Sequence, residues 1–82
     1  MVQLLDQLAD GARATVHAVR NESSDLDAAM LRRLAELGFI AGEPVQVLRR
    51  GPGGRDPLAV RIGDTLFALR RAEARCIEVL AD

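Results

Sequence analysis

The 82-residue chain contains no lysine, no tryptophan and no tyrosine, and it has one histidine and one cysteine. All eleven of its basic residues are therefore arginines. Without lysine, the chain lacks the side chain that a P-loop, a Schiff base or a lysine general base needs. Phe39 and Phe67 are its only aromatic residues, which is too few to stack single-stranded bases or to line a groove for proline-rich peptides. These absences argue against most enzyme classes and against nucleic-acid binding.

The charge balance and the remaining absences point to the same class of protein. Eleven basic and twelve acidic residues leave a formal net charge of −1, which provides no electrostatic footprint for nucleic acid. A single cysteine excludes a disulfide within the chain and fits a reducing compartment. Residues 1–11 lack the basic start of a signal peptide and contain Asp6 and Asp10. No apolar run reaches the roughly 20 residues of a membrane span. We therefore expect a cytoplasmic protein that does not insert into the membrane.

The length and composition are those of one small globular domain. Hydrophobic residues make up 49% of the chain and charged residues 28%, which is an ordinary balance for a folded protein. A chain of this size buries enough surface for one modest core. Because the sequence contains no repeat and no linker, we expect a single domain over residues 1–82.

The clearest local signal predicts a helix from Asp25 to Leu37. Ser24 and Asp27 have the spacing of a capping box at the helix start. Four apolar residues then recur at helical spacing, at Leu26, Met30, Leu34 and Leu37. Gly38 stands where a left-handed residue ends a helix, and Phe39 is placed to pack back on the last turn.

Two segments precede this helix. Residues Val2–Asp10 contain leucines at a spacing that allows at most one or two turns of helix before a glycine. Ala12–Val19 is predicted to be a strand, although Val16 and Val19 have opposite parity. A β-bulge between them would place both valines on the same face of the sheet.

After the helix, the hydrophobic period changes to two, which is typical of strands. Residues 51–57 have the composition of a loop, and Gly63-Asp64 that of a tight turn. The expected elements are strands at Pro44–Arg50, Leu58–Ile62, Thr65–Arg70 and Cys76–Leu80, with one helical turn at Ala72–Arg75. The expected core includes Leu34, Val45, Leu58, Val60, Leu69, Ile77 and Val79. Five short strands and one mid-chain helix predict a mostly β protein that forms a small antiparallel barrel.

The order of several short motifs also carries a resemblance. They are Arg33–Phe39 (RLAELGF), Ala41–Val45 (AGEPV), Asp56–Val60 (DPLAV), Leu66–Ala74 (LFALRRAEA) and Ile77–Val79 (IEV). Together they resemble the signature of the FeoA family, in register over nearly the whole chain from Leu4 to Val79. Each motif alone is weak, and their shared order is fairly specific.

This resemblance implies a fold and a function. It implies a small SH3-like barrel that serves bacterial ferrous iron uptake as a cytosolic accessory of the membrane transporter FeoB, which carries a GTP-binding domain. A similar barrel is the C-terminal module of iron-dependent repressors of the diphtheria-toxin-repressor type. Since the chain has no room for a helix-turn-helix domain, the resemblance implies the freestanding form.

Candidate metal ligands are few. His17 and Cys76 are the only soft ligands, and a tetrahedral zinc shell needs two more, for which Asp10, Glu22 and Glu78 are available. These residues lack a recognised metal-binding spacing. We therefore expect no resident cofactor, and a divalent metal at His17 is either adventitious or regulatory.

Catalytic machinery is also lacking. The glycine-rich run Gly51–Gly54 does not match the P-loop pattern and does not open a helix. A nucleophile pair of Cys76 or Ser24 with His17 lacks an orienting acid and an oxyanion hole. The sequence therefore predicts a protein that is not an enzyme.

Partner contacts are expected on the helix and the hairpin loop near it, with a groove between helix and barrel for a partner segment. Leu31 is apolar and lies off the main stripe of the helix, next to Arg32, while Arg55 flanks the loop. Arginine is favoured at interfaces because it forms planar, bidentate contacts. The first hypothesis is therefore docking on a FeoB-like transporter through Leu31, Arg32 and Arg55. The alternative is a metal-responsive regulatory module that binds a transition metal directly. The sequence leaves the oligomeric state open.

Overall fold

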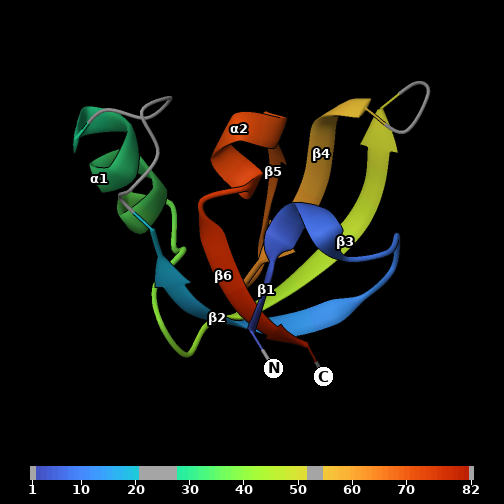
Figure 1. Ribbon diagram of the computed structural model, residues 1–82, viewed down its shortest axis with the longest axis horizontal. Coiled ribbons are helices and arrows are strands. Elements are labelled where there is room, and N and C mark those ends of the chain that lie inside the picture. Colours follow the sequence, from blue (N-terminus) through green and yellow to red (C-terminus); the bar gives the residue numbers. More distant parts are fainter. Residues whose placement is uncertain (1, 21–27, 52–54, 82) are drawn as a thin grey trace.

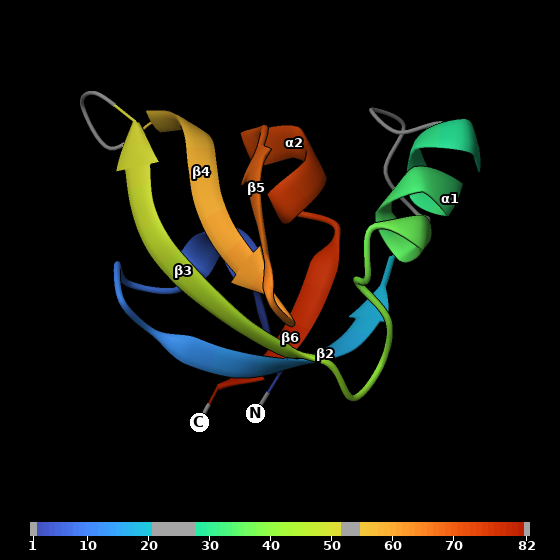
Figure 2. The same cartoon turned by 180° about the vertical axis from the view of Figure 1, so that it is seen from behind.

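The computed structural model describes residues 2–20, 28–51 and 55–81. The strands of this part form one antiparallel sheet with the order β1-β6-β2-β3-β4-β5. They are β1 (Val2–Leu4), β2 (Arg13–Val19), β3 (Pro44–Gly51), β4 (Arg55–Ile62), β5 (Thr65–Leu69) and β6 (Ile77–Ala81). The helical elements are the 3-10 helix η1 (Leu5–Gln7) and the α-helices α1 (Ala28–Glu36) and α2 (Arg71–Ala74). The strands curve around a common interior, α2 lies over one end of it, and α1 lies to one side (Figures 1 and 2).

The sequence predicts five strands in a closed barrel, whereas the described chain has six strands in an open sheet. The additional strand is β1, which pairs with β6 at the other end of the chain. The helical expectation for Val2–Asp10 is correct only for Leu5–Gln7. Three residues are too few to show an alternation, and the partner of β1 is distant in sequence, so no local signal reveals this pairing. β1 and β5 are the two edges of the sheet, with no pairing between them in the described chain.

Helix α1 ends as its sequence predicts. The Phe39 amide donates to the Leu34 carbonyl and the Gly38 amide to the Ala35 carbonyl, each at 3.1 Å. This pair of bonds is the Schellman arrangement, which needs a left-handed residue after the helix. Gly38 supplies it with φ +112°. The expected helix start at Asp25 and its capping box lie outside the described residues.

The bulge expected in the first long strand is present. The register of β2 against β6 shifts between Val16 and Ala18. As a result Val16 is buried and Val19 packs against the same core, although their sequence parity differs. His17 lies at the shift and is exposed.

The core is aliphatic, with a small aromatic contact at the helix end. All of the expected core residues are buried. The largest fully buried side chains are Phe39, Leu5, Leu34, Ile77, Val16, Val47, Val60 and Val79. The ring of Phe39 lies 6.2 Å from that of Phe67, centroid to centroid. This contact joins the segment after α1 to β5 and fixes how the helix sits beside the sheet.

Arg50 at the end of β3 holds the N-terminal segment against the sheet. Its guanidinium donates to the Asp10 carboxylate at 2.8 Å and to the carbonyls of Asp6 and Leu8 at 2.6 and 2.7 Å. The neighbouring Arg49 is exposed. Arg50 is therefore a structural residue of the fold.

None of the helices in the described part of the chain has the length and apolar character needed to cross a bilayer.

Candidate partner-docking groove

A groove lies between α1 and the edge of the sheet, as the sequence analysis expects. Its volume is about 380 Å³. It is lined by Met30, Arg33 and Leu37 from α1 and its end, by Phe67, Ala68, Leu69 and Arg70 from β5 and its end, and by Glu73 from α2. The groove thus has one wall from the helix and one from an edge strand.

The floor of the groove is apolar. Met30, Leu37 and Phe67 are half-buried and pack against the hydrophobic core. Ala68 is exposed on β5, so the groove is not filled at that position. An apolar side chain of a partner that packs on this floor would be removed from water, which favours binding.

The rim of the groove is charged. Arg33 and Arg70 are exposed, and neither side chain forms a hydrogen bond or ion pair with another described residue. The carboxylate of Glu73 accepts a hydrogen bond from the Arg70 backbone amide at 2.7 Å, which caps α2. The two guanidinium groups are therefore available to a partner, whereas the acid is already engaged in the fold.

The strand that forms one wall has an open edge. β5 lies at one edge of the described sheet and pairs only with β4. Within the described residues, no other backbone group hydrogen-bonds to Thr65–Leu69. An unpaired edge presents a row of amide and carbonyl groups to which another extended chain can add.

Two of the residues predicted to contact a partner, Leu31 and Arg32, lie on α1 next to this groove and do not line it. Leu31 is half-buried and packs against the core, so the expectation that it faces away from the apolar stripe is wrong. Arg32 is exposed on α1 and does not line the groove, whereas its neighbours Met30 and Arg33 do. Successive helical residues point about 100° apart, so Leu31 and Arg32 point in other directions than the groove-lining Met30 and Arg33. Whether Leu31 and Arg32 contact a partner stays a prediction.

The third predicted contact, Arg55, begins β4, and its side chain lies outside the described part of the structure. Its backbone pairs with Gly51 of β3. The hairpin end of β3 and β4 lies on the opposite side of the molecule from α1 (Figures 1 and 2), so the expected closeness of helix and loop is wrong. Both strands have eight residues and span about 26 Å. They carry the hairpin away from the helix.

The candidate metal ligands His17 and Cys76 differ in position and in burial. The strands β2 and β6 pair in the sheet. His17 lies at the β-bulge of β2, between residues that pair with Val79 and Glu78, whereas Cys76 precedes β6 and accepts a backbone hydrogen bond from Arg20. His17 is exposed, while Cys76 is buried and its thiol donates to the Ala72 carbonyl at 3.5 Å. Glu78 forms an ion pair with Arg20 at 3.4 Å. Among the described residues, no three metal-ligating side chains form a group. Glu22 lies outside them, and metal binding at His17 stays a prediction.

Comparison with known proteins decides the family. Residues 3–81 match the FeoA domain. The chain belongs to the FeoA family. FeoA of Stenotrophomonas maltophilia, solved in complex with zinc, is 40% identical with a TM-score of 0.79, and the match covers 98% of this chain and 89% of that one. That FeoA is described as a prokaryotic SH3 domain protein and a candidate activating factor of ferrous iron transport.

Other FeoA proteins share the fold. FeoA of Chlorobium tepidum is 37% identical with a TM-score of 0.83, covering 96% of this chain and 70% of that one. IdeR of T. acidophilum, at 20% identity and a TM-score of 0.78, shares the fold over 34% of its own length. A search of curated proteins found no significant match. The expected SH3-like fold is confirmed, and FeoA proteins serve ferrous iron transport.

The FeoA-like motifs of this chain meet at the groove. Arg33–Phe39 provides the helical wall and Leu66–Ala74 the strand wall and α2, so every lining residue except Met30 belongs to one of these two motifs. The sequence analysis uses these motifs for the family resemblance and does not name the groove residues that they contain. The site could have been located from the sequence only if these two motifs had been known to lie side by side. That requires the placement of β5 next to α1, which the structure provides.

Proposed function

We propose that this protein is a small cytosolic accessory protein of bacterial ferrous iron uptake, which docks on the cytoplasmic part of a FeoB-type transporter through the groove between α1 and β5. Membership of the FeoA family supports the process. The single observation that supports the docking surface is the groove itself, with an apolar floor, an open strand edge and two unpaired arginines on its rim.

The groove fits an extended segment. Such a segment would add to the free edge of β5 through backbone hydrogen bonds, which provide affinity, while an apolar side chain enters the floor at Ala68 and Phe67 and provides specificity. Acidic residues beside it would pair with Arg33 and Arg70, whose guanidinium groups form bidentate bonds with carboxylates.

The test is calorimetric titration of the full chain with the isolated cytoplasmic domain of the transporter. Arg33→Glu and Arg70→Glu together should weaken binding by at least about tenfold, because they replace attraction by repulsion at the rim. Ala68→Gln should weaken it as well, since the longer side chain occupies the groove without adding charge. Both changes are at exposed positions, and circular dichroism should show that the fold is kept.

Arg32→Glu is the matched control. It makes the same change of charge as Arg33→Glu alone, on the same helix, one residue from Arg33 and outside the groove. Unchanged binding by Arg32→Glu with weakened binding by the groove variants supports the proposal. The reverse result would move the contact to the predicted Arg32 surface, and unchanged binding by all variants would refute docking through the groove.

A further inference from the structure

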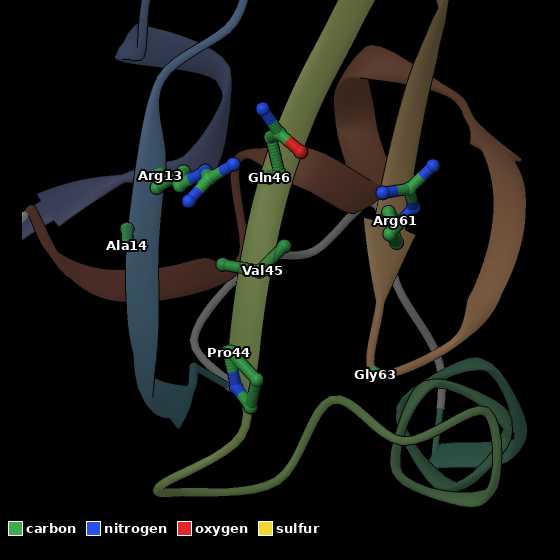
Figure 3. Close-up of a pocket in the computed structure, with 7 residues that line it drawn as sticks. All are labelled: Arg13, Ala14, Pro44, Val45, Gln46, Arg61 and Gly63. Carbon is green, nitrogen blue, oxygen red and sulfur yellow. The ribbon is translucent and has the colours of Figure 1, made fainter.

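A row of three polar side chains crosses the outer face of the sheet at a second hollow. Arg13 of β2 pairs with Gln46 of β3, and Gln46 pairs with Arg61 of β4, so the three residues stand side by side on adjacent strands. Figure 3 shows Arg13 reaching toward β3 and Arg61 on the other side of Gln46. Arg13 and Arg61 are exposed, and Gln46 is half-buried.

The two arginines have no partner of their own in the described chain. Arg20, Arg50 and Arg71 each form an ion pair. Arg13 and Arg61 form neither an ion pair nor a side-chain hydrogen bond with any described residue. Both guanidinium groups are therefore available to an anionic partner on this face of the sheet.

The fold holds this row in place. The Gln46 side-chain amide donates to the Gly11 carbonyl at 3.3 Å, so the central residue of the row is anchored. At one end, the Gly63 amide donates to the Pro44 carbonyl at 3.2 Å and extends the pairing of β3 with β4. The hollow between these strands has a volume of about 310 Å³.

Charge near the hollow is concentrated on the row. Glu43 and Asp64 adjoin its Pro44 and Gly63 end in the sequence, and the charged residues among those that line the hollow are Arg13 and Arg61. Because only two arginines form this positive region, it fits a ligand with two negative charges rather than a long polyanion.

We propose that the row Arg13–Gln46–Arg61 binds an extended acidic peptide segment whose two carboxylates are separated by one residue. Adjacent strands are about 4.8 Å apart, so the two arginines start about 10 Å apart, and their long side chains can converge. Carboxylates two residues apart on an extended chain lie about 6.8 Å from each other. Each guanidinium can then hold one carboxylate in a bidentate bond.

The same row provides an apolar contact beyond the charges. Arg61 pairs with Leu66 of β5, which is 60% exposed. Leu66 therefore lies about 5 Å further along the row. A segment crossing the strands would place an apolar side chain there, two residues after its second acid. The favoured pattern is acid, any residue, acid, any residue, apolar residue.

A peptide suits this site better than a nucleic acid or a membrane surface. Those polyanions are bound by broad fields of many basic residues, whereas this hollow has two arginines and acids at one end. The site also shares no lining residue with the docking groove. The proposal is therefore independent of the proposed function.

The test is an NMR titration of the full ¹⁵N-labelled chain with a capped heptapeptide, Ser-Glu-Ser-Glu-Ser-Leu-Ser. We expect shifts centred on Arg13, Gln46 and Arg61 and a dissociation constant below about 1 mM. The same peptide with glutamine in place of both glutamates should bind at least about tenfold more weakly, and added salt should weaken the glutamate peptide.

Variants complete the test. The double variant Arg13→Gln with Arg61→Gln should lose at least about tenfold in affinity. Arg75→Gln removes one positive charge from an exposed position outside the hollow and should bind as the unchanged chain does.

Four binding results would overturn the proposal. They are equal binding of the glutamine peptide, shifts confined to other residues, no binding at about 5 mM peptide, and tighter arginine-dependent binding of a short DNA duplex or of anionic phosphatidylserine vesicles. Self-association that the double variant abolishes would assign the row to a second copy of the chain and would overturn it as well.

Discussion

Replacing Arg50 by alanine tests how the N-terminal segment is held in the fold. The Arg50 side chain is 22% exposed and joins β3 to the segment after β1 through three hydrogen bonds. Two of its acceptors are the backbone carbonyls of Asp6 and Leu8, which lose this charged donor when the guanidinium is removed. Leu5 and Leu8, which this contact keeps in place, are buried in the core.

The expected loss of stability follows from these contacts. Each bond to a carbonyl contributes about 1 to 1.5 kcal/mol. The ion pair with Asp10 adds less than about 1 kcal/mol, because the Asp10 side chain is 57% exposed. The sum is about 3 kcal/mol, against a total of about 4 to 12 kcal/mol for a chain of this length. The melting temperature should fall by more than about ten degrees.

Urea unfolding followed by far-ultraviolet circular dichroism measures this loss. The chain has no tryptophan or tyrosine, so its intrinsic fluorescence is too weak to follow. Arg49→Ala is the matched control, since Arg49 is the adjacent arginine of β3 and is exposed. It should change the free energy of unfolding by less than about 0.5 kcal/mol. If Arg50→Ala costs no more than Arg49→Ala, the assigned role of Arg50 is refuted.

Three further predictions concern single residues. Gly38→Ala should lower the free energy of unfolding by at least about 1 to 2 kcal/mol in the same urea assay, because φ is +112°. The cost comes from the backbone conformation, since the new Cβ meets Ile62 at an ordinary 3.5 Å. An unchanged urea midpoint would contradict this. Cys76, which is 3% exposed, should react with a thiol reagent only after unfolding, and rapid reaction of the native chain would show that the thiol is accessible. At His17, calorimetry with zinc should detect only binding weaker than about 1 μM. Tighter binding that is lost in His17→Ala would support the metal-responsive alternative.

Local signals predict most of this fold. The stop at Gly38 and the bulge after Val16 follow from backbone rules that act over a few residues, and both are confirmed. The alternating strands after the helix and their buried residues are also as expected, except that β4 begins at Arg55, inside the segment predicted to be a loop. β1 is missed because its only partner is the last strand of the chain. The open sheet is missed for the same reason, because a sheet closes only if its two edge strands pair, and local sequence patterns do not show whether β1 and β5 do so.

The candidate site is less predictable than the fold. A groove beside the helix is expected from the sequence, but its lining depends on the rotation of α1 against the sheet. That rotation is set by buried contacts such as Phe39 with Phe67, which join segments far apart in the chain. As a result, Leu31 packs inward and Arg33 reaches the groove. The row of Arg13 and Arg61 gives no sequence signal at all, because only the register of three strands brings these arginines together.

Docking through the groove is the central claim, and an NMR titration of the full ¹⁵N-labelled chain with the cytoplasmic domain of its FeoB-type transporter tests it most directly. The account predicts that the amide signals of β5 and of the helix end, from Phe67 to Arg70 and from Arg33 to Leu37, shift first and most. Signals that shift only elsewhere, or that do not shift at saturating transporter domain, would contradict it.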